Sequence, residues 1–153
     1  LTGQSNEVIE RAVMKAKDKG IPVVAAVGNS GARAKPLYPA AYESAVAVTA
    51  VSSSLKVYRR AGQGGHVDFA APGVGLEVQS PRGKIELKTG TSFAVPYVTS
   101  ALAVMRQARP QTTVDQLVSE LARSARDLGD PGKDDTFGWG LVQLAGICRL
   151  IQP

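Results

Sequence analysis

Three short apolar runs constrain the fold more than any other feature of this sequence. They are "IPVVAAVGN" at residues 21–29, "SAVAVTAV" at 44–51 and the weaker "HVDFAAPG" at 66–73. None alternates polar with apolar residues, so each indicates a strand that is covered on both faces. Strands of this kind belong to parallel sheets packed between helices. The sequence therefore predicts an α/β layered domain with a mostly parallel sheet.

Helical and hairpin patterns surround these runs. Periodic apolar positions predict four helices, in chain order over residues 5–19, after Ser92, over 113–125 and over 141–150. Residues 74–88 predict a β-hairpin. For the first helix, Ser5 or Asn6 is the expected cap and Gly20 the stop. Thr112 and Asp115 have the spacing of a capping box, which we expect at the start of the third helix.

The composition is that of an ordinary globular domain. The chain has 153 residues, of which 44% are apolar and 20% charged, and no apolar run reaches the roughly 18 to 20 residues that span a bilayer. We expect no membrane partner. The net charge is +5, but the basic residues are scattered and aromatic residues are few, so we expect solvated faces rather than a nucleic-acid surface. Its lone cysteine, Cys148, excludes an intrachain disulfide.

The stretch "KTGTSFAVP" at residues 88–96 raises the question of function. Ser92 stands where a helix is expected to begin, which suits a helix cap as well as a nucleophile. A serine nucleophile needs a sharp turn, donors for the developing oxyanion and a base. Gly90 allows the turn, and Asn29, at the end of a buried strand, has a side-chain amide that could be a donor. Taken singly, Ser92 as a cap and Asn29 as a turn residue are the simpler interpretations.

Taken together, six motifs form a recognisable series. "VVAAVGNSG", "LYPAAY", "VAVTAV", "VDFAAPG", "GTSFAVP" and "FGWGLV" occur in the order seen in the subtilisin-like serine proteases (subtilases), and the chain resembles that family from its first residue to about Leu144. The 63 positions between Asn29 and Ser92 are of the family's size. The resemblance implies a subtilisin-like three-layer α/β fold and a serine endopeptidase that acts on polypeptides.

The resemblance also implies roles for individual residues. Ser92 would be the nucleophile, and Asn29 would donate to the oxyanion together with the Ser92 backbone N–H. A strand segment that pairs with extended substrate would be formed by Leu1, Thr2 and Gly3. One wall of the pocket for the substrate side chain would be formed by Ala25, Ala26, Val27 and Gly28. Residues 38–40 resemble a segment near the pocket base. No cofactor or catalytic metal is implied, although some relatives bind a cation through carbonyls near Ala40 and Tyr42. Most relatives are exported, which favours an extracytoplasmic location.

One part of the family's machinery is absent from these residues. In the family, the catalytic Asp and His precede the oxyanion Asn, yet no histidine precedes Asn29. The only histidine, His66, falls outside the family's base motif, and we expect it in an exposed loop. We therefore interpret residues 1–153 as the C-terminal part of a catalytic domain, with a cut start at Leu1, and expect this fragment to be inactive.

That interpretation has two consequences, and three alternatives to it stay open. The strand at 21–26 would lose a neighbour, and an unpaired apolar strand favours a homo-oligomer formed through the exposed sheet edge. A partner chain could instead supply Asp and His. From another class, a non-catalytic subtilisin-like domain could serve in binding or assembly. A structural α/β domain with coincidental motifs is the last alternative.

Overall fold

The computed structural model describes residues 2–81 and 83–144. Its elements in chain order are α1 (Glu7–Asp18), β1 (Val23–Ala26), β2 (Ala45–Val51), β3 (Phe69–Pro72), β4 (Leu76–Gln79), β5 (Ile85–Lys88), the 3₁₀ turn η1 (Thr91–Phe93), α2 (Val95–Ala108) and α3 (Val114–Ser124). The three strands, the hairpin and the first three helices expected from the sequence are all present.

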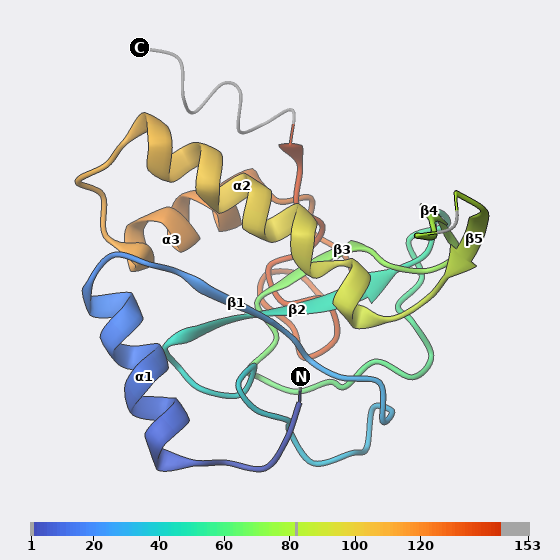
Figure 1. The fold of residues 1–153 in the computed structure, drawn as a ribbon, viewed down its shortest axis with the longest axis horizontal. Helices are drawn as coiled ribbons and strands as arrows, with labels where there is room; N and C mark the ends of the chain where they lie inside the picture. The colour runs from blue at the N-terminus through green and yellow to red at the C-terminus, as the bar shows by residue number, and fades with distance from the viewer. Residues whose placement is uncertain (1, 82, 145–153) are drawn as a thin grey trace.

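The central sheet is parallel, in the order β1-β2-β3 (Figure 1). Ala45 of β2 lies beside Val23 of β1, and Val48 of β2 lies beside Phe69 of β3. All seven residues of β2 are buried, as the absence of alternation in its sequence predicts. β4 and β5 form a separate antiparallel hairpin that projects from one end of the molecule in Figure 1. The prediction of an α/β fold with a parallel sheet is confirmed.

Helices cover both faces of this sheet. α2 and α3 pack on one face and α1 lies on the other (Figure 1). The larger core cluster joins Val48 and Phe69 of the sheet to Leu102 of α2 and to Leu117 and Leu121 of α3. All five side chains are at most 1% exposed, so each contributes roughly 1.5–3 kcal/mol through burial. This burial holds the ends of the parallel strands in fixed positions.

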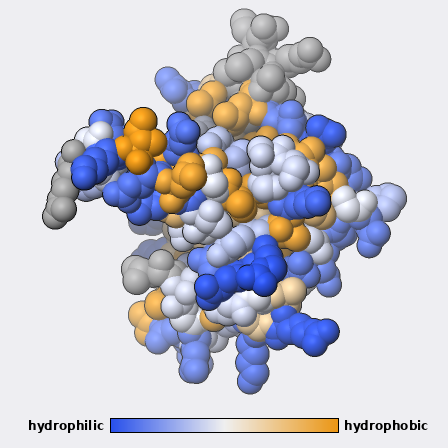
Figure 2. Space-filling model, turned by 90° about the vertical axis from the view of Figure 1, so that its right-hand side faces the viewer, coloured by the Kyte–Doolittle hydropathy of each residue, from blue (hydrophilic) through white to orange (hydrophobic). Residues whose placement is uncertain are grey.

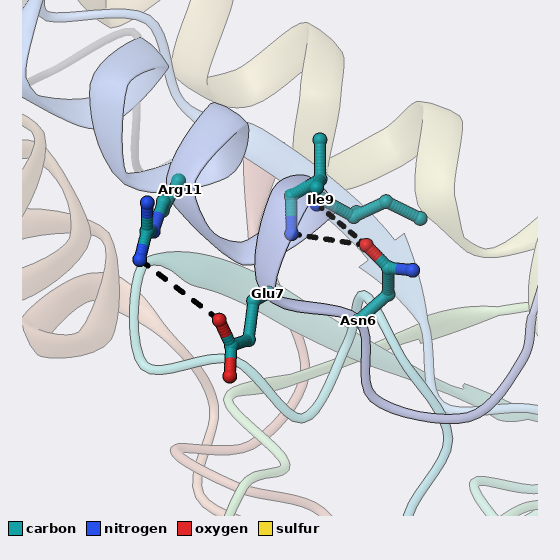
Figure 3. A network of polar contacts seen from close by, with 5 residues as sticks. Asn6, Glu7, Ile9 and Arg11 are labelled. Carbon is teal, nitrogen blue, oxygen red and sulfur yellow. Dashed lines mark hydrogen bonds and ion pairs between the residues drawn. The ribbon is translucent and has the colours of Figure 1, made fainter.

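Asn6 caps α1, as one of the two expected candidates. Its Oδ1 accepts from the N–H of Val8 at 3.0 Å and of Ile9 at 3.2 Å (Figure 3). The Tyr42 hydroxyl closes the same turn, since it donates to the Asn6 carbonyl and accepts from the Asn6 N–H. The neighbouring Glu7–Arg11 pair is 3.9 Å long and almost fully exposed, so it adds little. The cap therefore fixes where α1 begins and ties it to the chain before β2.

The predicted capping box of the third helix is wrong by one residue. Thr113 Oγ1 accepts from the Gln116 N–H at 3.2 Å, and Gln116 Oε1 accepts from the Thr113 N–H at 2.9 Å. Thr112 cannot take this place because its carbonyl accepts a bond from the Arg106 guanidinium, which holds it outside the helix. Asp115 instead forms an ion pair with Lys17 of α1 at 2.7 Å.

The expected start of the final helix is also wrong. Leu141 exchanges two backbone hydrogen bonds of 2.8 Å with Arg126, and the Val142 N–H donates to the Ala70 carbonyl at 3.0 Å. Leu141 and Val142 therefore lie along the outer side of β3 rather than in a helix, because their backbone groups are already bonded to Arg126 and Ala70. A helix could begin at Leu144 at the earliest, and the remainder of the prediction, with Cys148, lies outside the described residues.

The two outer sides of the sheet differ. Residues 140–142 cover β3, whereas no strand among residues 2–81 and 83–144 pairs with the outer side of β1.

The same part of the chain contains no helix that is both long and apolar enough to span a bilayer.

Candidate active site

The carboxyl end of the sheet gathers the residues in question. Because the strands are parallel, Asn29 follows β1 and Gly73 follows β3 at this same end. The hairpin then returns the chain, and the Gly90 N–H donates to the Gly73 carbonyl at 2.9 Å. A Cβ on Gly73 would lie 2.6 Å from Ala50 Cβ and 3.0 Å from the Gly90 carbonyl oxygen. Only glycine permits this close approach, which fixes the segment that leads to Ser92.

Ser92 is exposed in the middle of η1, and a buried residue lies on either side of it within two positions. Thr91 and Ala94 are both 0% exposed, so the turn is anchored on either side of the serine. The N–H groups of Phe93 and Ala94 donate back to Gly90 and Thr91, each at 3.1 Å. By contrast, the Ser92 N–H has no hydrogen-bond acceptor within the described residues. The serine therefore combines a solvent-facing hydroxyl with a backbone donor that the fold leaves unused.

Asn29 is tied to the residue before Ser92. Its Oδ1 accepts from the Thr91 N–H at 3.0 Å and from the Thr91 hydroxyl at 3.1 Å. Since a backbone N–H can only donate, these bonds identify which amide atom is the oxygen. The other amide atom, Nδ2, faces Gly90 and has no acceptor in the described part of the chain. Asn29 thus presents a second unused donor beside the first turn of the helix.

Thr91 is the residue of this site that the sequence reasoning missed. Its hydroxyl is fully buried, and a buried hydroxyl needs a partner, which Asn29 provides. The available signal was its place directly before the serine in "GTS". The sequence places Asn29 in a glycine-flanked loop, and in the fold the threonine orients the asparagine amide.

The residues predicted to bind substrate fall in adjoining segments. Gly3 and Tyr38 exchange backbone bonds of 2.9 and 3.0 Å. Gly28 has a φ of +95°, and a Cβ there would lie 2.6 Å from Leu37 Cδ1, so Leu37 packs directly against the predicted pocket wall. Thr2 is exposed beside Gly3, and Leu1 lies outside the described residues.

Within that wall, the side chains of Ala25 and Val27 belong to the core and are at most 7% exposed. Ala26 is half-buried, whereas Gly28 is buried. We infer that Ala26 is the part of this wall that a ligand could reach.

The expectation of an exposed His66 is wrong. The side chain is half-buried, and its Nε2 is buried without a partner among the described residues. This burial lowers the pKa of His66, and Lys133 acts in the same direction, whereas Asp68 and Asp135 oppose it. His66 precedes β3 and so lies at the amino end of the sheet, and β3 alone separates the two ends by about 10 Å. It is too far from Ser92 to act as its base.

Metal binding has little support from side chains. No three His, Cys, Asp or Glu residues of the described chain gather where they could hold a metal ion. The carbonyl site predicted near Ala40 and Tyr42 would not depend on such side chains, so it stays a prediction.

An exposed serine beside two unused donors, at the carboxyl end of a parallel sheet, is typical of the serine hydrolases. The comparison with known families is specific: the chain belongs to the subtilase family, whose model matches residues 2–140.

Individual relatives agree with this assignment. The chain is 36% identical over 143 residues to the minor extracellular protease Epr of Bacillus subtilis (strain 168), an overlap of 93% of this chain and 22% of that protein. It is 35% identical over 141 residues to subtilisin BL of Lederbergia lenta, covering 92% and 51% of the two chains. The solved structure of a lanthipeptide protease superimposes with a TM-score of 0.83 at 25% identity, covering 95% and 55%. The chain therefore spans about half or less of the length of these relatives.

Proposed function

We propose that these residues are the nucleophile-bearing, C-terminal part of a serine endopeptidase catalytic domain. The hydroxyl of Ser92 attacks the carbonyl carbon of a peptide bond, and the resulting oxyanion accepts from the Ser92 N–H and from Asn29 Nδ2. The observation that carries the proposal is the pair of bonds from Thr91 to Asn29 Oδ1, since they hold Asn29 against the residue before Ser92 and leave Nδ2 without an acceptor among the described residues. Fixed donors of this kind stabilise the transition state because they need no reorganisation during the reaction.

The rest of the reaction needs groups from outside these residues. A base must take the Ser92 proton as the Oγ–C bond forms, and must return it to the amine as the C–N bond breaks. Water then hydrolyses the ester of Ser92. The one histidine lies at the other end of the sheet, so we propose that Asp and His come from a preceding part of the same gene product. The isolated chain would then be inactive.

The proposed roles of the adjoining segments follow from their position. An extended substrate would pair with residues 1–3, whose Gly3 is held by Tyr38. Its side chain before the cleaved bond would meet the wall of residues 25–28, with Leu37 beside Gly28. Because Leu37 is apolar and lies against that wall, we expect an apolar rather than a charged side chain at this position.

The test uses the complete protein that contains these residues. A fluorophosphonate probe, which modifies activated serines, should label the complete protein quickly and the Ser92→Ala variant not at all. Turnover should fall on the order of 10⁶-fold, as on loss of the nucleophile in a subtilisin. Ser100→Ala is the matched control, because Ser100 is exposed on α2 and its hydroxyl makes no hydrogen bond within the described residues. Equal labelling of wild type and Ser92→Ala would refute the proposal.

The distance of His66 from Ser92 also favours a second candidate, a non-catalytic domain that serves in binding or assembly. The same probe separates the two, since such a domain would leave the complete protein unlabelled. Rapid labelling of the isolated 153 residues would contradict the predicted inactivity. Activity that returned only on mixing with another chain would mean that a partner supplies the base.

Three further properties are proposed more briefly. The uncovered outer side of β1 would pair with a second copy in the isolated chain, and a monomer by light scattering at high concentration would contradict this. A cation at carbonyls near Ala40 and Tyr42 should raise the melting temperature in a way that a chelator reverses. The name of the Bacillus subtilis relative favours an extracellular location, which fractionation of cells would test.

A further inference from the structure

Five basic side chains lie on two loops that leave the same end of the sheet as the candidate site. We call this set the basic rim; it comprises Arg33, Lys35, Lys56, Arg59 and Arg60. All five are exposed, and none forms an ion pair or a side-chain hydrogen bond within the described residues. The ion pairs of that part of the chain use other cations, namely Arg11, Lys17, Lys88, Arg109 and Lys133. The rim is therefore positive charge that the described fold does not neutralise.

Two backbone contacts bring the rim to Asn29. Arg33 and Lys35 lie in the loop that follows β1, and the other three residues lie in the loop that follows β2. The Gly62 N–H donates to the Gly28 carbonyl at 3.1 Å, and the Gly31 N–H donates to the Arg60 carbonyl at 2.8 Å. Asn29 lies between these two contacts in the chain. Both loops thus leave the carboxyl end of the sheet, where Ser92 also lies.

Acidic residues are missing from the same loops. Between Lys19 and Val67 the sequence contains one, Glu43, and it precedes β2 at the opposite end of the sheet. Like charges on adjoining loops repel one another, and an anionic ligand would relieve that repulsion. Figure 2 looks onto the end of the molecule where the strands of Figure 1 finish; strongly hydrophilic side chains protrude from its lower half, and hydrophobic groups lie mostly above them.

We propose that the basic rim binds acidic side chains of the polypeptide substrate close to the bond that Ser92 attacks. This proposal rests on the proposed function and specifies its substrate class, a peptide with Asp or Glu near the cleaved bond. The apolar side chain expected against Leu37 and the acidic side chains at the rim would occupy different substrate positions. Charge complementarity would act both on binding and on the rate of encounter.

A polypeptide fits this surface better than a nucleic acid does. Single-stranded nucleic acid is held by exposed aromatic rings on which bases stack, in addition to basic residues. The tyrosines in the two loops that carry the rim are Tyr38, Tyr42 and Tyr58, and each packs against or within a core cluster. A basic rim without a stacking platform indicates a ligand whose carboxylates provide the contact.

The experiment measures binding without cleavage. The complete protein carrying Ser92→Ala is titrated with a fluorescent peptide that has two Glu residues on each side of a central Leu-Ala bond, and with its twin in which every Glu is Gln. We expect tighter binding of the acidic peptide, by about two- to fivefold for each Glu that meets a rim cation. The preference should vanish near 1 M salt, where the Debye length is about 3 Å.

Two double variants of equal charge locate the effect. Arg33→Gln/Lys35→Gln should lose most of the preference, and Lys15→Gln/Lys19→Gln should keep it. The control lysines are exposed too, but they lie at the end of α1 that leads to the amino end of β1. Neither pair of side chains makes a bond within the described residues, so both doubles should fold, which equal melting temperatures would verify.

Three results would overturn the proposal: equal affinity for the two peptides, equal loss in the two double variants, or displacement of the acidic peptide by a tighter-binding single-stranded oligonucleotide. The last would reassign the rim to nucleic acid. Because the binding assay needs no reaction at Ser92, these failures are distinguishable from a failure of the fluorophosphonate test, which concerns the proposed function alone.

Discussion

Asn29 and Asp68 lie at opposite ends of the same sheet, and the fold uses them differently. Each carboxylate oxygen of Asp68 has a partner: one accepts from the Ala47 N–H at 2.8 Å, and the other accepts from Lys133 Nζ at 3.0 Å. Its backbone N–H donates to the Ala47 carbonyl, and its carbonyl accepts from the Trp139 N–H. Asn29 has half of its amide bonded to Thr91 and the other half unused within the described residues.

The difference separates polar groups that hold the fold from those available for chemistry. At the amino end, Asp68 joins β2, β3 and the loop that contains Lys133. At the carboxyl end, the unused donors of Asn29 and Ser92 and the unpaired rim cations are groups that a ligand could satisfy. Mutation of a polar group that is bonded within the fold should mainly lower the stability of the protein. Mutation of a group that is left without a partner should mainly lower its activity. The predictions below test that separation, beginning with the largest effect.

Asn29→Asp should reduce kcat of the complete protein by about 10²- to 10³-fold, the cost of removing one oxyanion donor. The carboxylate can still accept from Thr91, but it has no N–H to offer and its charge repels the oxyanion. Steady-state kinetics on a peptide substrate provide the measurement, and stability should change little. Asn6→Asp is the control, since Asp caps a helix as well as Asn does. A decrease of only a few-fold for Asn29→Asp would remove the distinction between the two ends.

Asp68→Ala should lower the free energy of unfolding by about 1.5–3 kcal/mol, because it breaks bonds to a charged acceptor and leaves the Ala47 N–H unpaired. Urea unfolding measures this loss, and kcat of the folded enzyme should be unchanged. Asp18→Ala serves for comparison, since Asp18 is exposed and unpaired within the described residues. An Asp68→Ala variant that kept its stability and lost its activity would reverse the proposed separation.

Thr91→Val should slow turnover by about two- to tenfold, the worth of one hydrogen bond of roughly 0.5–1.5 kcal/mol. Valine has the shape of threonine and keeps the backbone N–H bond to Asn29, so the amide should lose part of its orientation rather than its position. A fall in kcat at constant KM would identify this role, and Thr91→Ser should restore the rate. If Val and Ser variants behaved alike, the hydroxyl would not orient Asn29.

The smallest effect concerns His66, whose buried Nε2 has no partner among the described residues. Its pKa in the folded protein is lowered from 6.5, chiefly by burial. Folding therefore favours neutral His66, and the associated stability is present above pH 6.5 and lost as the pH falls through the lower folded pKa. Melting temperatures measured downward from pH 7 should decrease less for His66→Gln than for wild type. Parallel curves would mean that His66 does not contribute.

Much of the fold follows from local pattern. The unbroken apolar run at 44–51 predicts the buried central strand, because a strand covered on both faces needs no polar positions. The cap at Asn6 and the hairpin at 74–88 follow equally well, since neighbouring residues determine both. The errors arose where a group outside the predicted helix bonds to its first residues, as when Arg106 binds the Thr112 carbonyl or Leu141 pairs with Arg126.

For the site, the order of the sequence motifs was enough to identify Ser92 and Asn29 as the candidate residues and to indicate the family. Their arrangement came from the folded molecule, since Thr91 and Asn29 are 62 positions apart and meet only because parallel strands end side by side. The basic rim arose in the same way, from loops that two backbone contacts bring together. Local interactions are encoded in adjacent residues, whereas the meeting of strand ends depends on packing of the whole sheet between its helices.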